Sequence, residues 1–491
     1  MKLTRATKRL LSHPIRTLSL IAALAGGLAL AGAQAADQGP RQHAGGAYEA
    51  ATTHYVVVAG DDLATIAERF GVSVHELKTH NKLASDTIEA GQKLTIPGDP
   101  INSGYKMTTP IAPGVATPNT LETSIGTLHL SDGFPKPDTI EKIYDNLDRS
   151  RALQAYLLAI PIVNQADMRD SMRQFGPDNQ TDVIWETLVD PKTVELTAND
   201  NTIYNFIWID THKGPVALEI PPMSLGAVDD FWYRWVTDVG ITGPDKGKGG
   251  KYLILPPGYK GEVPQGYFVV RPSTYGNWVP FRTFLVDGSP KPGVESVKKT
   301  LKIYPLADAA NPAPVKLANA SGIPSNFVFP GDYSFWELLN QVIQEEPSEG
   351  SDPTTLGLFA SIGIEKGKPF SPDERMKKIL ADAANVGAAT ARALAFKMRE
   401  KDAFFYPDSQ WRLPFFGGYK FEVSPGVANL DGAAFFYFFA TGVTPAMEEK
   451  MVGKGSQYPW TALDANGNPF DGAKTYKLHL PPNIPVKDFW S

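Results

Sequence analysis

The chain of 491 residues contains no cysteine, so disulfide bonds and thiolate metal sites are both excluded. Its eight histidines are scattered, and none has the H-x-H or H-E-x-x-H spacing of a histidine-based metal centre. The nearest approach is His75-Glu76, where Thr79 stands at the position of the second histidine. The G-x-S-x-G motif of a serine hydrolase is also missing. The sequence therefore predicts no metal and no cofactor, and it leaves any catalytic residues unknown.

The sequence also lacks an excess of positive charge. With 47 basic and 53 acidic residues, its formal net charge is −6, which argues against nucleic acid or anionic lipid as the main partner. Hydrophobic residues make up 42% and aromatic residues 11% of the chain, enough for buried cores. The 44 glycines and 41 prolines predict many turns, and the length predicts two or three domains.

Long apolar runs are missing except near the N-terminus. Five basic residues and no acidic one accompany an apolar run from Leu18 to Leu30, followed by Ala33-Gln34-Ala35. These are the parts of a secretory signal peptide, here over 1–35. An uncleaved anchor is the alternative, but the run is shorter than the ~20 residues of a spanning helix. We expect cleavage after Ala35, no stable membrane span, and a periplasmic or cell-wall-associated protein.

Residues 52–98 have the pattern of a small domain. They predict, in order, a strand over 55–58, a helix over 63–70, a second helix from Val74 and a strand over 94–97. Asp61 or Asp62 is placed to cap the first helix, and Gly71 is placed to end it. Ser73 is placed to cap the second helix.

This order, with Gly60-Asp61-x-Leu63, Asn81 and Gly91-Gln92-x-Leu94, resembles the LysM family. The resemblance implies a partner: peptidoglycan or another N-acetylglucosamine polymer such as chitin, held in a shallow groove between two loops. Carried over, the groove residues are Gly60, Asp61, Asp62, Leu63, Asn81, Lys82, Leu83 and Ile88. Leu63 has an alternative role in the core, and Asn81 has one in bracing a loop. A single copy implies weak binding, because avidity normally comes from repeats.

Residues 99–120 are rich in proline and glycine and predict a linker. From Leu121 the chain resembles the paired domains of unknown function 1254 and 1214 of exported bacterial proteins. The residues that carry this resemblance include Ser131-Asp132-Gly133-Phe134-Pro135, Asn199 to Tyr204, Gly442 to Met447 and His479 to Asn483. The resemblance implies the first domain over 121–310, a helical connecting segment over 311–400 and the second domain over 401–491. It implies no activity.

The pattern of residues 121–491 predicts a mainly β region with helical segments. Strands are predicted at Ile203–Ile209, Val216–Ile220, Phe231–Val236, Gly266–Arg271, Tyr419–Val423, Ala434–Phe439 and Tyr476–Leu480. Helices are predicted at Glu141–Leu158 and Asp373–Glu400, the second capped by Ser371-Pro372. We therefore expect two β-sandwich, jelly-roll-like domains joined by a helical segment.

The sequence ends inside a strand that is predicted to begin at Val486. Compared with the family pattern, this predicts a second sandwich that lacks strands and exposes a sheet edge. We favour an incomplete gene or fragment. The alternative is a partner chain that completes the sandwich, in which case the protein oligomerises.

Polar residues at the two ends of the predicted strand 203–209 form the best candidate pocket. With polar residues further along the chain, the set is Asn199, Asp200, Asn201, Tyr204, Asp210, Arg271, Tyr275 and Arg282. Such residues suit a sugar, a divalent cation or a polar substrate, but Asn-Asp-Asn is also ordinary turn chemistry. Trp232 is expected to be exposed, because Phe231, Tyr233 and Trp235 share the other face of the predicted strand.

The glycine-rich segment Gly243 to Lys251 invites a phosphate-binding interpretation. It lacks the Walker spacing and precedes a strand, so we favour a solvated hairpin loop. Two functions therefore stay open. The first is a wall-attached binding or structural protein. The second is an exported enzyme, acting on envelope polymers or small polar compounds, that the LysM-like segment localises. The enzyme requires one deep pocket joining Asp200, Tyr204, Asp210 and an arginine.

Overall fold

The computed structural model describes residues 53–97, 114–115, 118–131, 133–449, 451, 457–480 and 482–483. They form two compact units that meet in the sequence between Ala116 and Thr117. The expected signal peptide at 1–35, most of the expected linker at 99–120 and the expected strand from Val486 lie outside the described residues. None of the described helices combines the length and apolar character needed to cross a membrane.

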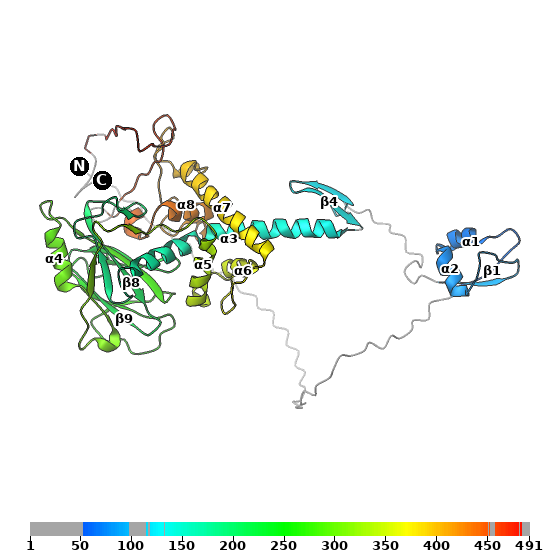
Figure 1. Cartoon of the computed structure of the whole chain (residues 1–491), viewed down its shortest axis with the longest axis horizontal. Coiled ribbons are helices and arrows are strands. Elements are labelled where there is room, and N and C mark those ends of the chain that lie inside the picture. Colours follow the sequence, from blue (N-terminus) through cyan, green and yellow to red (C-terminus); the bar gives the residue numbers. More distant parts are fainter. Residues whose placement is uncertain are drawn as a thin grey trace, which may run out of the picture. The chain divides into compact units, whose positions relative to one another are not determined.

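The first unit has the expected order of elements. It consists of β1 (Thr53–Val56), α1 (Leu63–Phe70), α2 (Val74–Asn81) and β2 (Lys93–Ile96) (Figure 1). The two strands pair antiparallel, and β1 begins and ends two residues earlier than predicted. Their core consists of Val57, Leu63, Ile66, Ala67, Leu77, Leu94 and Ile96.

Local capping interactions define the helix ends of this unit. Asp62, rather than Asp61, caps α1, and its carboxylate accepts the N–H of Thr65 at 2.7 Å. Gly71 ends α1 with a φ of 69°, a conformation that favours glycine. Ser73 and Glu76 form a reciprocal capping box at the start of α2. Each cap contributes about 1 kcal/mol, a large share of the stability of so small a core.

The second unit is built around two large sheets. The six-stranded sheet has the order β11 (Trp235–Gly240), β10 (Leu225–Asp230), β14 (Gly276–Phe284), β8 (Thr202–Asp210), β6 (Thr181–Ile184), β16 (Lys316–Asn319). The four-stranded sheet has the order β13 (Phe268–Val270), β12 (Gly250–Ile254), β9 (Val216–Ile220), β15 (Lys302–Pro305). Apolar side chains of both sheets share one core, so these strands form the β-sandwich expected in the first large domain.

Three small sheets complete the strands of this unit. They are β3 (Thr120–Thr123) with β4 (Gly126–Ser131) and β5 (Phe134–Pro135), β7 (Thr193–Val194) with β17 (Ser325–Asn326), and β18 (Glu422–Ser424) with β19 (Val427–Ala428).

Strand β8 has two buried faces. Ile203, Ile207 and Ile209 lie in the core between the two sheets. Phe206 and Trp208 lie in a second core, on the other face of the sheet. The paired strand β14 alternates in the same way, with Val279 in the first core and Trp278 in the second. Helices must therefore cover the second face.

The helices supply this cover. They are α3 (Pro137–Arg173), α4 (Lys291–Thr300), α5 (Ser334–Glu345), α6 (Pro353–Ser361), α7 (Glu374–Phe396), α8 (Leu430–Phe439) and α9 (Pro445–Glu448), with 3-10 turns at Leu306–Asp308, Ser348–Gly350 and Lys401–Ala403. Residues of α3, α5, α7 and α8 share the core of Phe206 and Trp278. Figure 1 shows α3 running from the β4 hairpin into the body of the unit, beside α5 and α7. The predicted helix Glu141–Leu158 lies within α3, whereas the predicted helix Asp373–Glu400 contains α7, which already ends at Phe396. Asp373, rather than Ser371-Pro372, caps α7.

Four predicted strands differ in the structure. Residues 231–234 form the turn between β10 and β11, so Phe231–Val236 is not one strand. The predicted strand Ala434–Phe439 lies in helix α8, whose apolar residues occur on all sides and therefore show no helical period. Tyr476–Leu480 is not in a strand, and only the end of Tyr419–Val423 enters β18. Among the described residues of 401–491, β18 and β19 thus stand in place of the expected second sandwich.

The close packing of α3 on α7 gives a first prediction. A Cβ atom on Gly387 of α7 would lie 2.3 Å from Cδ1 of Tyr156, a buried residue of α3. We expect Gly387→Ala to lower the free energy of unfolding by about 1–3 kcal/mol, because the buried ring cannot move away freely. Urea unfolding followed by tryptophan fluorescence measures this, since all nine tryptophans follow residue 116.

Gly357→Ala in α6 is the matched control, because nothing lies within 4 Å of its added Cβ atom. This variant should be neutral or more stable by up to ~1 kcal/mol, the usual gain of alanine over glycine in a helix. If Gly387→Ala were as stable as Gly357→Ala, the close contact between α3 and α7 would be contradicted.

Candidate functional site

The antiparallel pairing of β1 with β2 brings together the two loops of the expected glycan groove. Val57 continues the pairing beyond β1: its N–H donates to Gln92 at 2.9 Å, and its carbonyl accepts from Gly91 at 2.7 Å. The loop that follows Val57 therefore begins beside the loop that precedes β2. The eight predicted groove residues lie on these loops or at the adjoining helix ends.

The acidic residues of the first loop are engaged in local structure. Asp61 accepts the hydroxyl of Tyr55 at 2.7 Å and the N–H of Val58 at 2.9 Å, and the latter bond is the main reason why its pKa is lowered. Asp62 is occupied as the cap of α1. Gly60 has a φ of 99° and is exposed, so its backbone is open to a ligand.

The remaining groove residues divide into bracing, buried and accessible ones. Asn81 exchanges hydrogen bonds with the backbone of Thr95 at 2.7 Å and donates to Leu77, so it braces the second strand. Leu63 is 2% exposed and belongs to the core. The other three are accessible: Lys82 is exposed, and Leu83 and Ile88 are half-buried against the core.

The polar residues expected to form one pocket in the second unit lie in separate places. Asn199, Tyr204 and Arg282 line a cavity of about 190 Å³. Arg282 lies opposite Tyr204 in the register of β14 and β8, with its guanidinium 5.8 Å from the Tyr204 ring centre. The amide of Asn199 donates to the Tyr204 hydroxyl at 2.9 Å. Asp200 and Asn201 do not line this cavity, and Arg271 is exposed elsewhere.

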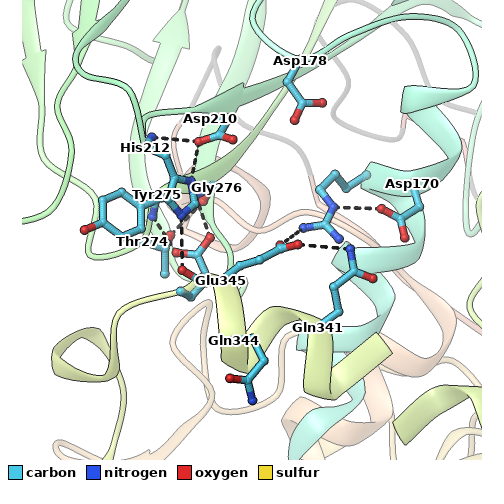
Figure 2. A network of polar contacts seen from close by, with 12 residues as sticks. Asp170, Asp178, Asp210, His212, Thr274, Tyr275, Gly276, Gln341, Gln344 and Glu345 are labelled. Carbon is cyan, nitrogen blue, oxygen red and sulfur yellow. Dashed lines mark hydrogen bonds and ion pairs between the residues drawn. The ribbon is translucent and has the colours of Figure 1, made fainter. Parts of the chain in front are cut away.

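Asp210 and Tyr275 meet at the opposite end of β8 and β14 (Figure 2). The Asp210 carboxylate lies 2.6 Å from Nδ1 of His212, and the imidazole stacks on Tyr275 with ring centres 4.1 Å apart. Nε2 of His212 lies 3.3 Å from the carbonyl of Glu345. Both ring nitrogens thus contact protein groups, so His212 is placed to clamp the loop after β8 onto the end of α5.

Buried carboxylate and guanidinium groups complete this corner (Figure 2). Glu346 is 2% exposed and accepts the N–H groups of Tyr275 and Gly276 at 2.6 and 2.9 Å. Arg169, which is 1% exposed, pairs with Glu345 and with Asp170. These contacts tie α3 and α5 to β14. The described residues contain no group of three or more histidine or acidic side chains placed to hold a metal ion.

Two further sequence interpretations can be compared with the structure. In the loop Gly243 to Lys251, the buried carboxylate of Asp245 accepts the N–H groups of Gly240 and Gly249 and the hydroxyl of Tyr252. These backbone N–H groups are therefore already occupied by a carboxylate of the loop itself. Trp232 is half-buried rather than exposed, whereas Phe231 and Tyr233 are buried as expected.

Comparison with known families agrees with the order of domains inferred from the sequence. Residues 55–97 match the LysM domain family. This segment is a LysM domain. Residues 180–305 match the protein family of unknown function DUF1254, and residues 455–491 match the family of unknown function DUF1214.

One relative extends the comparison of the LysM domain. The cell wall-binding protein YocH of Bacillus subtilis (strain 168) is 47% identical over 47 residues, which is 10% of this chain. The chain spans 16% of the length of that protein.

Two solved structures resemble the chain weakly. The VPA0106 protein from Vibrio parahaemolyticus aligns with a TM-score of 0.44 and 20% identity over 61% of this chain and 69% of that one. An uncharacterized protein from Burkholderia cenocepacia aligns with a TM-score of 0.20 and 12% identity over 51% and 60% of the two chains.

The corner at Glu346 predicts a pH-dependent stability. Burial raises the pKa of Glu346 to about 7, so the folded protein holds this proton more tightly than the unfolded chain does. Its contribution to stability is therefore lost as the pH rises from about 4.5 to 7. For His212, burial alone would lower the pKa, but the hydrogen bond and charge of Asp210 raise it overall. Its contribution is present below its ordinary pKa and lost as the pH rises through the raised one, which is the same direction.

We expect Glu346→Gln to reduce the loss of unfolding free energy between about pH 5 and pH 7.5 by on the order of 2–3 kcal/mol. Urea unfolding at a series of pH values measures the two slopes. Glu349→Gln, at an exposed position three residues away, should leave the slope of the wild type unchanged. Equal slopes in the wild type and Glu346→Gln would show that Glu346 does not hold its proton in this range.

Proposed function

We propose that this protein attaches to peptidoglycan, or a related N-acetylglucosamine polymer, through its LysM domain. The observation that carries the proposal is the pairing of Val57 with Gly91 and Gln92, which places the loops at 58–62 and 82–92 side by side within a LysM fold. The relative YocH, named as cell wall-binding, supports this choice of ligand.

The groove supplies both kinds of contact that an acetamido sugar needs. The exposed backbone at Gly60 and the exposed Lys82 provide hydrogen-bonding groups. Leu83 and Ile88 provide a small apolar floor for the methyl group. Asp61, Asp62 and Asn81 support the groove indirectly, because their hydrogen bonds to neighbouring backbone groups hold the two loops in place. Leu63 supports the floor from the core.

We propose further that the N-terminal segment 1–35 directs export, so that the LysM domain meets the cell wall outside the cytoplasm. The second unit then serves as a binding or structural body localised on the wall. The alternative enzyme would need Asp200, Tyr204 and Asp210 in one pocket. Tyr204 and Asp210 lie at opposite ends of β8, and Asp200 is exposed outside the cavity, which favours the binding function.

Co-sedimentation with purified peptidoglycan tests the attachment. We expect the full chain to sediment with the glycan and a variant lacking residues 36–98 to stay in solution. Ile88→Ser should weaken retention by roughly tenfold, about 1.4 kcal/mol, because a polar group replaces the apolar floor. Lys82→Gly should weaken it without loss of folding, because Lys82 has a φ of 52°, which glycine adopts more readily.

Glu68→Ser is the matched control, since Glu68 is exposed on α1 away from its first turn. It should bind as the wild type does. Hydrogen exchange of α1 and α2, measured in each full-length variant, separates a lost contact from an unfolded domain. Retention of the protein lacking 36–98 would refute the proposal. Equal retention by all three point variants would place the glycan elsewhere on the LysM domain. Parallel sedimentation with chitin distinguishes the two polymers.

A further inference from the structure

The cavity beside Arg282 lies where the six-stranded sheet meets α8 and the described residues around Phe415, Val443 and Trp460. From the sheet it is lined by Tyr204, Phe206, Trp278 and Arg282, all on the face that looks toward the helices. From the other side it is closed by aromatic residues, which are Phe415, Phe436, Phe439, Tyr458 and Trp460. Its volume of about 190 Å³ exceeds the ~150 Å³ cavity that accommodates benzene in an engineered protein core, so it has room for one ring and a small substituent.

Several buried polar atoms on the cavity wall have no partner among the described residues. They are Oε2 of Glu195, Oδ1 of Asp229, Oγ1 of Thr242 and Nε1 of Trp278. Asp229 is 0% and Trp278 2% exposed, so bulk water does not solvate them. A buried polar atom without a partner costs about 1–3 kcal/mol. Four such atoms around one cavity indicate a place that is built to exchange hydrogen bonds with something inside it.

The charge of the cavity wall is positive near neutral pH. Burial raises the pKa of Glu195 to about 8 and that of Asp229 well above its usual range, so both carboxyl groups favour the neutral form. Arg282 has no ion pair with a carboxylate within the part of the chain that the structure describes. Its guanidinium contacts the phenol groups of Tyr204 and Tyr458 instead. One cation thus stands among neutral hydrogen-bond donors and aromatic rings.

We propose that this cavity is a binding site for a compact organic anion, namely a molecule with a single apolar ring and one carboxylate. The ring packs among Phe206, Trp278 and Phe439, where aromatic faces and edges favour another ring. The carboxylate pairs with Arg282, whose planar guanidinium can donate two parallel hydrogen bonds. The protonated Glu195 and the indole of Trp278 donate further hydrogen bonds. Tyr204 and Arg282 are only half-buried, so this end of the cavity is the entrance.

Titration calorimetry of the full-length protein with benzoate tests the site. A ligand of this size should bind with a Kd on the order of 1 mM or below. Benzyl alcohol, which has the ring without the charge, should bind at least about tenfold more weakly. Arg282→Met keeps the volume but removes the charge and should weaken benzoate binding by a similar factor. Arg271→Met, at the exposed arginine outside the cavity, should bind as the wild type does.

A pH series supplies a test that does not depend on the folding of the Arg282 variant. Benzoate affinity of the wild type should fall as the pH rises through about 8, because Glu195 then becomes a carboxylate and repels the ligand. Glu195→Gln should remove this fall. Equal binding of benzoate and benzyl alcohol would overturn the assignment of an anion. The absence of saturable benzoate binding to the wild type would mean that water alone fills the cavity, which would also overturn it. Neither result affects the glycan-binding proposal, because that site lies in the other unit.

Discussion

The second unit depends on the burial of both faces of the β8–β14 pair. Each strand is nine residues long, and the two are in register from Gly276 opposite Asp210 to Phe284 opposite Thr202. Because successive side chains point to opposite faces, each strand must bury apolar residues on two sides. One side is covered by the four-stranded sheet and the other by α3, α5 and α8. An antiparallel pair with one solvated face would need only one of these two covers.

The two ends of the β8–β14 pair are covered by different parts of the chain. The polar cluster at Glu346 lies at one end, and the polar cluster at Arg282 lies at the other. At the Gly276 end, the carboxylate of Glu346 accepts two backbone N–H groups, and a Cβ atom on Gly276 would lie 3.0 Å from that carboxylate. The carboxyl group of Glu346 and the imidazole of His212 are both held by protein groups at this end, as expected of a structural corner. At the Arg282 end, α8 and the residues around Phe415 and Trp460 leave a cavity between themselves and the sheet, with unpaired polar atoms on its wall. Because side chains alternate between the two faces of β14, Trp278 and Arg282 lie on the same face of this strand, and both line the cavity.

The sequence predicts the fold wherever local signals are strong. In the LysM domain, the caps at Asp62, Gly71 and Ser73 define the helices without help from distant residues. In β8, the apolar run Ile203–Ile209 correctly predicts a strand, and the structure adds that both of its faces are covered. The prediction of a strand at Ala434–Phe439 was wrong, since these residues lie in helix α8. A short segment that is apolar on all sides has no periodicity by which a helix can be distinguished from a strand. The turn at 231–234 was missed because its aromatic residues are buried despite lying in a turn.

The candidate sites show the same difference. Individual residues can be named from the sequence, but contacts between residues far apart in the chain can be seen only in the structure. Tyr204 and Arg282 were named from the sequence, but only the pairing of β14 with β8 shows that they lie opposite each other. Glu195 was missed, because a lone glutamate outside any motif gives no sign that distant strands will bury it. Trp278 carried a usable signal, since it shares the strand face of Arg282 by a spacing of four residues. Prediction from sequence therefore fails here for groups whose chemistry is set by burial. Those same groups, with their raised pKa values and unpaired atoms, are the observations behind the proposed anion site.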